Sequence, residues 1–521
     1  MDLFQKIIDN NSPSMYTLHT LFLFLLIAFL FVRWKFASIK KFTLSTDSWG
    51  DYNIINDIRN NNHFLPKSFP KYEYSQNLYP CLMHWFLSFF KKSRVESIAI
   101  YVGTAMDIMH LFLLYYFSYW LFGYFYISLL SSFIFILSII SLPYFSRTFS
   151  PCGRAMGEFF VSLSTVSLFL YFKTSAVEYA LFSSFVIALT LLGSRFGTQA
   201  IAFSFILFSI FESSIFIVVL ILGVVFAFLF SGGFYLKILK GHWGGIYYFY
   251  NVREKRSIVS GDSDIKKLFI FFRNPFKNYN QLKNNKLING IITTPQVLVL
   301  PATLILIDFP NFSFNESFLL LWSSIMFLVS VFTALNFARC VGPSNRYINY
   351  SKFPLSLLLA TVVVLHYNVF LLILLTLIIF YLTYRTTKVY NNLKKQSQLD
   401  IQENIDRNNE VFSFLNDLPE TKILTSPFNL AHELIYKTNH SSIYYEGTLS
   451  AKESVQHIRT TLQFPYPDLE ASEEEFEFTH ILQNEKNVAG FLKSNPEYSY
   501  NFKYDSYEKI FSNGLYSVFK R

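Results

Sequence analysis

Two aspartates stand four residues apart in the polar segment that follows the first apolar run of the sequence. They are Asp47 and Asp51, in the run Thr-Asp-Ser-Trp-Gly-Asp-Tyr. If a helix begins here, residues four apart share one of its faces. Asp47 could then remove a proton from an acceptor hydroxyl with Asp51 as its helper, or the two carboxylates could hold a divalent cation such as Mg²⁺ or Mn²⁺. The alternative is a helix cap at Asp47 and a solvated first-turn residue at Asp51.

The residues that follow predict a helix and a second polar position. Ile54, Ile55 and Ile58 have the spacing of an amphipathic helix that could lie on the bilayer surface. Further on, the run Tyr-Pro-Cys-Leu-Met-His ends at His84, which stands in an apolar setting. His84 is a candidate substrate ligand, and the alternative is a satisfied histidine at the membrane interface.

Four arginines stand at the predicted ends of apolar runs: Arg147, Arg154, Arg195 and Arg346. An ionised group at a membrane boundary is costly and often marks a site, and arginine is the preferred bidentate ligand of phosphate. Cations on a leaving phosphate and a carboxylate on the attacking hydroxyl are what transfer from a lipid phosphate needs. Each arginine could instead be an anchor that snorkels to lipid headgroups. Glu158, four residues after Arg154, either pairs with it or lies beside it in a cavity.

The elements that must position these residues are membrane helices. The 521 residues are 52% hydrophobic and only 15% charged, against about 25% charged in a soluble protein. We predict about 11 spans, because each needs roughly 20 mostly apolar residues. They are 17–36, 95–122, 124–142, 155–172, 176–193, 198–211, 214–230, 291–307, 318–337, 354–366 and 369–384.

The predicted domains are a transmembrane part, 1–387, and a small soluble α/β domain, 388–521. In the soluble domain a strand over 422–425, a helix ending near Lys437 and a strand from Ser442 are predicted. One side of the membrane receives the acidic loop 37–93, the basic loop 232–290, all four arginines and the C-terminal domain. The positive-inside rule would put that side in the cytoplasm, although long loops weaken the rule.

Several of these segments resemble GT-C glycosyltransferases, which include protein O-mannosyltransferases and aminoarabinose transferases. An aspartate at a helix start after the first span, a helix ending in Leu-Pro and a following Tyr-Pro with His84 resemble the first external loop of that superfamily. The turn around Arg147 and Arg154 is similar to an arginine-containing turn there, and Arg346-Tyr347 lies in a similar Gly-x-x-x-Arg-Tyr-x-x-Tyr run. The segment 232–250 with His242 is family-like as well. The Trp-Trp-Asp motif of oligosaccharyltransferases is absent from the sequence.

The resemblance implies an all-α polytopic membrane bundle that moves a sugar from a polyprenyl-phosphate carrier to a glycan, lipid or protein acceptor. It also implies that the side of the membrane with the two long loops and the C-terminal domain faces away from the cytoplasm. In that case Asp47 is the base or a metal ligand, and Arg154 and Arg346 are phosphate ligands. His84, Arg147, Glu158, Arg195, His242 and Tyr347 are the other candidate substrate ligands. The chain is expected in the inner or plasma membrane.

Other functions stay open: a transporter or lipid flippase, a polysaccharide polymerase or ligase, or a scaffold that binds a partner through its C-terminal domain. Paired interrupted helices and inverted repeats, which a transporter would show, are not evident in the sequence. The 61 Phe and 34 Tyr residues suit lipid-facing and interfacial positions, so no nucleic-acid partner is expected. Three cysteines, Cys81, Cys152 and Cys340, form neither a disulfide framework nor a metal motif.

Overall fold

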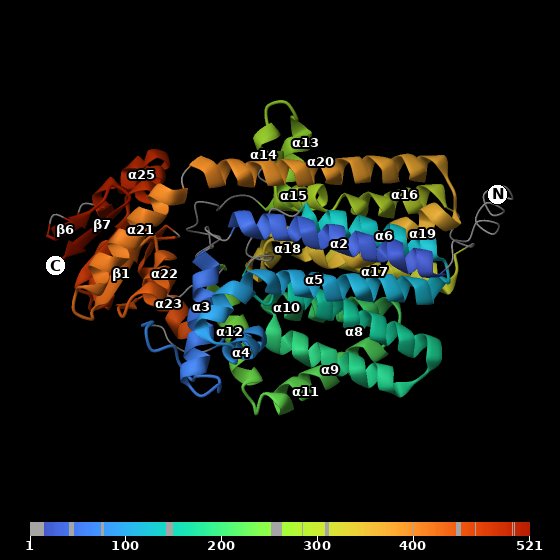
Figure 1. The fold of residues 1–521 in the computed structure, drawn as a ribbon, viewed down its shortest axis with the longest axis horizontal. Helices are drawn as coiled ribbons and strands as arrows, with labels where there is room; N and C mark the ends of the chain where they lie inside the picture. Colours follow the sequence, from blue (N-terminus) through green and yellow to red (C-terminus); the bar gives the residue numbers. More distant parts are fainter. Residues whose placement is uncertain are drawn as a thin grey trace.

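The chain folds into a bundle of long helices with a small mixed domain at one end (Figure 1). The computed structural model describes residues 15–40, 46–73, 78–141, 150–248, 250–251, 263–283, 285–307, 312–399, 401–443, 450–463, 465–502, 504 and 506–521. The helices of the bundle are α2 (Met15–Lys40), α5 (Lys92–Phe122), α6 (Phe125–Ile140), α8 (Arg154–Thr174), α9 (Val177–Gly193), α10 (Arg195–Phe211), α11 (Ile215–Phe230), α15 (Lys286–Thr293), α16 (Val299–Leu306), α17 (Phe314–Thr333), α19 (Lys352–Leu365) and α20 (Val369–Leu399).

Each of the 11 predicted spans overlaps a helix, but fewer helices are long and apolar enough to cross a membrane alone. Within the described residues six meet that test, and up to eight spans result if two bent helix pairs are each counted as one. The pairs are α11 with α12 (Tyr235–Tyr248), which meet at 115°, and α15 with the short helix η2 (Pro295–Leu298) and α16, at 90°. Helices α6, α9 and α10 are apolar but shorter. The chain is therefore an integral multi-pass membrane protein, and the helix lengths do not confirm the predicted number of 11 spans.

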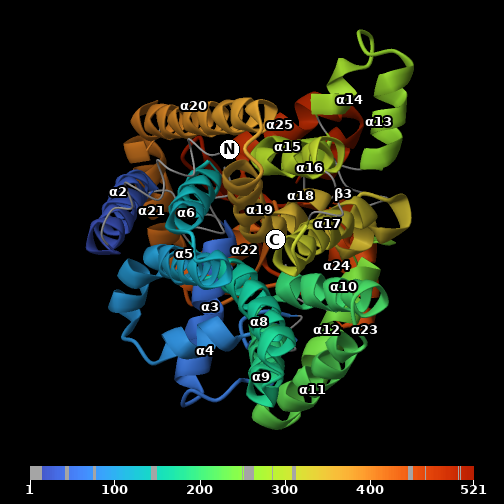
Figure 2. The same cartoon turned by 90° about the vertical axis from the view of Figure 1, so that its right-hand side faces the viewer.

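Helix α19 lies in the interior of the bundle, between α6 and α17, as the end-on view shows (Figure 2). Twelve of its 14 residues are buried, including Lys352, whose ammonium donates to the Ser138 carbonyl at 3.2 Å. A buried ion pair joins two outer helices, with Arg33 of α2 2.6 Å from Asp107 of α5. Charges inside a membrane protein are costly unless they are paired in this way.

The short helices gather at the end of the bundle that meets the C-terminal domain. They are α3 (Thr46–Asn60), α4 (Leu82–Ser88) and α12, and Figure 1 shows them between the bundle and that domain. On the side of the bundle lie α13 (Asp264–Arg273) and α14 (Tyr279–Lys283). The turn before α19 consists of η4 (Asn336–Val341), α18 (Ser344–Tyr347) and η5 (Ile348–Ser351).

Helix α20 continues past position 387 and leads through α21 (Ile401–Asn416) into a five-stranded sheet of order β2-β1-β5-β7-β6. The strands are β1 (Lys422–Ser426), β2 (Ser441–Ser442), β5 (His480–Asn484), β6 (Glu508–Ser512) and β7 (Tyr516–Lys520), and β3 (Thr461–Gln463) pairs with β4 (Tyr466–Pro467) apart from them. Strand β1 is parallel to β2 and β5, and β7 is antiparallel to β5 and β6.

The helices of this domain are α22 (Leu430–Lys437), α23 (Ala451–Arg459), α24 (Leu469–Glu475) and α25 (Glu485–Ser494), followed by the short helix η6 (Pro496–Phe502). The predicted strand, helix and strand between 422 and 442 correspond to β1, α22 and β2. A small α/β element at the C-terminal end is therefore present.

The first loop is built into this domain although the contacting residues stand 349 to 370 positions apart in the sequence. The backbone of Tyr72 pairs with Ser442 in parallel, so that the loop extends the sheet beside β2. The Lys71 ammonium donates to the Thr438 carbonyl at 2.9 Å, and Lys422 forms an ion pair with Glu73 at 2.6 Å. Loop and domain thus form one cap over the end of the bundle.

Candidate active site

A hydrogen-bonded carboxylate lies at the centre of this end of the bundle. Asp51 of α3 is buried, and its Oδ1 accepts from Nε2 of His84 at 2.8 Å. Its Oδ2 accepts from the Ser150 hydroxyl at 2.5 Å. Three segments, α3, α4 and the chain just before α8, therefore meet at one side chain. Asp51 is not a solvated first-turn residue, and the side chain of His84 is fully buried.

Asp47 stands one helical turn before Asp51, in the first turn of α3. The spacing of four residues puts the two positions on one face of the helix, as predicted. The side chain of Asp47 and the whole of Arg147 lie outside the described residues, so their predicted roles remain predictions.

Tyr79 lies between the Asp51 network and Arg154 in its electrostatic interactions. Its ring meets the His84 ring edge to face, with centroids 5.5 Å apart. Burial raises the pKa of the Tyr79 hydroxyl above its usual range, the negative charge of Asp51 raises that pKa further, and the Arg154 guanidinium opposes this rise. One hydroxyl therefore lies within electrostatic reach of both the carboxylate and the guanidinium.

Two of the predicted phosphate ligands share one aromatic ring. The guanidinium carbon of Arg154 lies 5.9 Å from the centre of the Phe196 ring, and that of Arg346 lies 4.6 Å from it. Arg154 begins α8 and Arg346 lies in α18, so the ring brings together cations from distant segments. Cation–π contact of this kind attracts a guanidinium to the face of the ring and helps to hold it in place.

Close backbone approach makes this arrangement possible. A Cβ on Gly153 would lie 1.9 Å from the Gly193 carbonyl oxygen, and one on Gly157 would lie 2.4 Å from the Ser194 hydroxyl. Larger residues would push the start of α8 away from the turn between α9 and α10. The two glycines therefore set the distance between Arg154 and Phe196.

Arg195, His242 and Tyr347 extend the site toward α12. A Cβ on Gly245 of α12 would lie 2.3 Å from Nη2 of Arg195, so the guanidinium lies against that helix. His242 is buried and stands three residues before Gly245, on the same face of α12. Tyr347 is fully buried, and its hydroxyl donates to Oε1 of Gln199 at 2.6 Å, which fixes the turn that carries Arg346. Glu158 is buried in the second turn of α8.

Three further members of this site are not predicted by the sequence: Ser150, Tyr79 and Phe196. Phe196 is one of 61 phenylalanines and has no distinguishing local pattern. Ser150 stands inside the arginine-containing turn, but its type alone does not mark it.

The prediction that the face of Ile54, Ile55 and Ile58 could lie on the bilayer surface is wrong. These side chains are buried against α4 and α22.

The described residues do not form a metal site around Asp51. Both of its carboxylate oxygens accept hydrogen bonds from protein donors, and no group of three His, Cys, Asp or Glu side chains in the described part of the chain could hold a metal ion.

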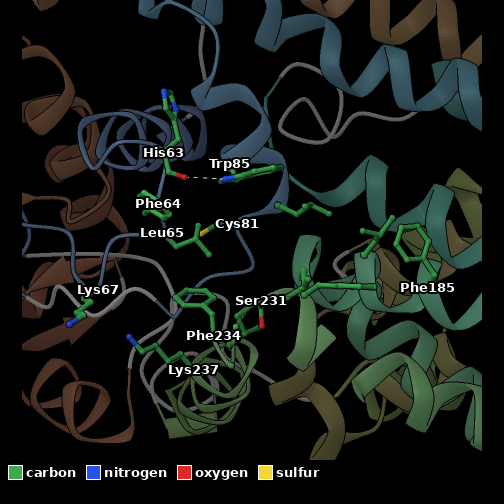
Figure 3. A pocket seen from close by; sticks show the side chains of 17 residues that line it. His63, Phe64, Leu65, Lys67, Cys81, Trp85, Phe185, Ser231, Phe234 and Lys237 are labelled. Atoms are coloured by element: carbon green, nitrogen blue, oxygen red, sulfur yellow. Dashed lines mark hydrogen bonds between the residues drawn. The ribbon is translucent and has the colours of Figure 1, made fainter. Parts of the chain in front are cut away.

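An apolar cavity of about 730 Å³ lies beside this network. The segment 63–67, α4, α9 and the corner between α11 and α12 line it (Figure 3). Leu82, Trp85 and Phe185 are among its apolar side chains, and Lys67 and Lys237 also line it. The cavity thus combines an apolar wall with two lysines, and α4, which carries His84, forms part of its lining.

The bundle and the cap over its end have the same fold as solved membrane glycosyltransferases. ArnT of Cupriavidus metallidurans, solved with undecaprenyl phosphate, is similar over 96% of this chain and 97% of that one, with a TM-score of 0.52 and 12% identity. The Archaeoglobus fulgidus oligosaccharyltransferase, tethered to an acceptor peptide, is similar over 90% and 69%, with a TM-score of 0.53 and 12% identity. The same oligosaccharyltransferase in complex with zinc and sulfate is similar over 88% of this chain and 67% of that one, with a TM-score of 0.50 and 13% identity.

At these identities the likeness shows the fold. No protein-family model matches the sequence, and no curated protein matches it.

Proposed function

We propose that this protein is a membrane glycosyltransferase that moves a sugar from a polyprenyl-phosphate carrier to an acceptor hydroxyl or amide at the membrane surface. The observation that carries the proposal is the position of the Asp51 network within this fold. It lies at the capped end of the bundle, one helical turn from Asp47 and within electrostatic reach of Arg154 through Tyr79. ArnT, whose fold matches along its whole length, was solved with a polyprenyl phosphate.

The proposed roles follow from chemistry. Asp47 takes the proton of the acceptor, whose oxygen or nitrogen forms a bond to C1 of the sugar. The bond between C1 and the phosphate oxygen breaks, and its electron pair leaves with the phosphate, whose charge Arg154 and Arg346 stabilise. Asp51 holds His84 and Ser150 and so positions α3. The apolar cavity in Figure 3 takes the polyprenyl chain.

Binding of the lipid tests the donor site without knowledge of the sugar. Purified protein is titrated with undecaprenyl phosphate and, separately, with undecaprenol, which lacks the phosphate. We expect Arg154→Ala and Arg346→Ala each to weaken binding of the phosphate about 10- to 100-fold and to leave undecaprenol binding unchanged. Equal losses for both lipids would show that the arginines only shape the fold.

Transfer itself tests the base. Asp47→Asn should lower sugar transfer in isolated membranes about 100- to 10,000-fold. Glu178→Gln, an exposed carboxylate at the start of α9, is the matched control and should transfer normally. Normal transfer by Asp47→Asn would refute this role for the loop. The divalent cation at Asp47 and Asp51 stays a prediction, to be tested by chelation and re-addition of Mg²⁺ or Mn²⁺ in the same assay.

We place the protein in the inner or plasma membrane, with its capped end on the side away from the cytoplasm. In the GT-C families that the sequence resembles, the lipid-phosphate sugar donor is used on that side. Reporter cysteines at the exposed positions Ser68 and Asp417 should react with an impermeant maleimide on intact cells. The native Cys81, Cys152 and Cys340 are buried, which keeps the background low. Protection of both reporters would place this end in the cytoplasm and refute the mechanism.

A further inference from the structure

A second cavity lies on the other side of α3, between that helix and α22 of the C-terminal domain. It encloses about 480 Å³, within the roughly 300–1,000 Å³ range of ligand sites. Its lining is polar, unlike that of the cavity in Figure 3, and every residue that lines it is described.

The cavity is separate from the Asp51 network because it lies against the opposite face of the helix. Asn53, Asn56, Asp57 and Asn60 line it at helical spacing, and so mark one face of α3. Asn60 stands nine residues after Asp51, which is two and a half turns at 3.6 residues per turn. A ligand here would therefore not reach the Asp51 carboxylate.

Five amides line the cavity: Asn53, Asn56, Asn60, Asn416 and Asn439. Each amide both donates and accepts hydrogen bonds, as a sugar hydroxyl does. Three of them already bond to protein, since Asn53 donates to the Tyr72 hydroxyl, Asn56 accepts from Arg59, and Asn416 donates to the Lys437 carbonyl. Asn60 and Asn439 are exposed at the rim. Fixed and exposed amides together suit a ligand with several hydroxyls.

Positive charge exceeds negative charge in the lining. Arg59, Lys71, Lys92 and Lys437 contribute four cations, and Asp57 is the one carboxylate among the lining residues. Glu433 pairs with Lys437 at 2.8 Å. Burial lowers the pKa of Lys71; the charges of Glu420 and Asp57 oppose this, and Lys92 adds to it. Lys71 and Lys92 both line the cavity, so their positive charges repel each other, and an anionic group bound there would relieve that repulsion.

We infer that this cavity is a second glycan site, which binds a sugar bearing one anionic substituent, with the anion between Lys71 and Lys92 and the hydroxyls on the asparagines. The substituent is a carboxylate, as in a uronic acid, or a phosphate. Charge-assisted hydrogen bonds from ammonium groups recognise either one. The ring of Tyr436, under the Lys92 ammonium at 4.7 Å, gives the site an aromatic wall.

The test is a binding titration on purified full-length Asp47→Asn protein, so that the outcome does not depend on transfer. The probes are glucuronate, glucose 1-phosphate, glucose and inorganic phosphate. We expect glucuronate, glucose 1-phosphate or both to bind at least about tenfold more tightly than glucose and than phosphate alone. The stronger of the two identifies the substituent. The proposal would be overturned if glucose bound as tightly as both charged sugars, or if inorganic phosphate alone bound as tightly as they do.

Variants locate the binding. Lys92→Gln is preferred to a change at Lys71, because Lys71 also holds the Thr438 carbonyl. It should weaken binding about tenfold, and Asn439→Trp, at the exposed rim, should abolish binding by filling the cavity. Lys486→Gln, an exposed lysine on α25, is the matched control and should leave the affinity unchanged. Unaltered binding in both cavity variants would place the sugar elsewhere and refute the site.

Discussion

Helix α3 carries two aspartates six residues apart whose surroundings differ. Asp51 faces the bundle, where a histidine and a serine donate to its two oxygens. Asp57 faces the polar cavity, where burial raises its pKa to about 6 and Lys71 opposes that rise. One side of the helix is thus fixed by protein hydrogen bonds, which suits the positioning of a catalytic group. The other side keeps its polar groups less satisfied, which suits a ligand.

The largest effect is expected on the fixed side. Asp51→Ala leaves the His84 N–H and the Ser150 hydroxyl buried without their acceptor, which costs about 2–4 kcal/mol of folding free energy. We also expect transfer to fall about 100-fold, because Asp47 and the start of α8 lose their common anchor. Thermal unfolding and transfer in membranes are the measurements.

Ser150→Ala separates the positioning role from folding alone. This variant removes one donor and leaves the Asp51 carboxylate paired with His84, so its stability should change by only about 1 kcal/mol. A large loss of sugar transfer with a loss of only about 1 kcal/mol in the free energy of unfolding would support a role of Ser150 and Asp51 in positioning the site. A parallel and small loss of both in the two variants would reduce the Asp51 network to a packing feature.

The contrast between the two faces also shows what a sequence can predict. The helix start at Asp47, the shared face of Asp47 and Asp51, and the apolar stripe of Ile54, Ile55 and Ile58 are local patterns, and the structure contains the helix. What covers the stripe is not local. Its partner, α22, lies about 370 residues further along the chain, so the sequence suggested a bilayer where the protein supplies its own cover.

The candidate site follows the same division. An arginine at the end of an apolar run can be recognised in the sequence, and Arg154 and Arg346 do meet at the Phe196 ring. The ring between them was not predictable, since Phe196 differs from other phenylalanines only in its neighbours. The number of spans is not confirmed for a related reason: the 90° bend between α15 and α16 falls within the predicted span 291–307, and the apolar helices α6, α9 and α10 are short.

A medium effect is expected where the C-terminal domain holds α3. The Asn53 amide donates to the Tyr72 hydroxyl and to the His432 carbonyl, both at 2.9 Å. Asn53→Ala should therefore destabilise the cap by about 2 kcal/mol and speed cleavage of the C-terminal domain in limited proteolysis. Asn60→Ala, on the same face but exposed, should change stability by less than about 0.5 kcal/mol. Equal sensitivity of the two variants would mean that this face of α3 is not where the domain is held.

The smallest effect is the pH dependence that Asp57 brings to the ligand side. Its pKa in the folded chain is about 6, above the ordinary 3.8, so between these values the folded state binds more protons than the unfolded state. The free energy of unfolding should then rise as the pH falls through 6 and level off below 4, by about 1 kcal/mol for this partly exposed group.

His457 acts in the opposite direction over an overlapping range, because burial lowers its pKa from 6.5 to about 3 and folding is weakened as the pH falls below 6.5. The quantity to measure is therefore the difference between wild type and Asp57→Asn at each pH, in which the contribution of His457 cancels. The difference should be largest at neutral pH, where wild type alone carries the buried charge, and should shrink toward pH 4. A difference that is flat with pH would show that Asp57 is solvated like an ordinary surface carboxylate, and the two faces of α3 would then differ less than their contacts indicate.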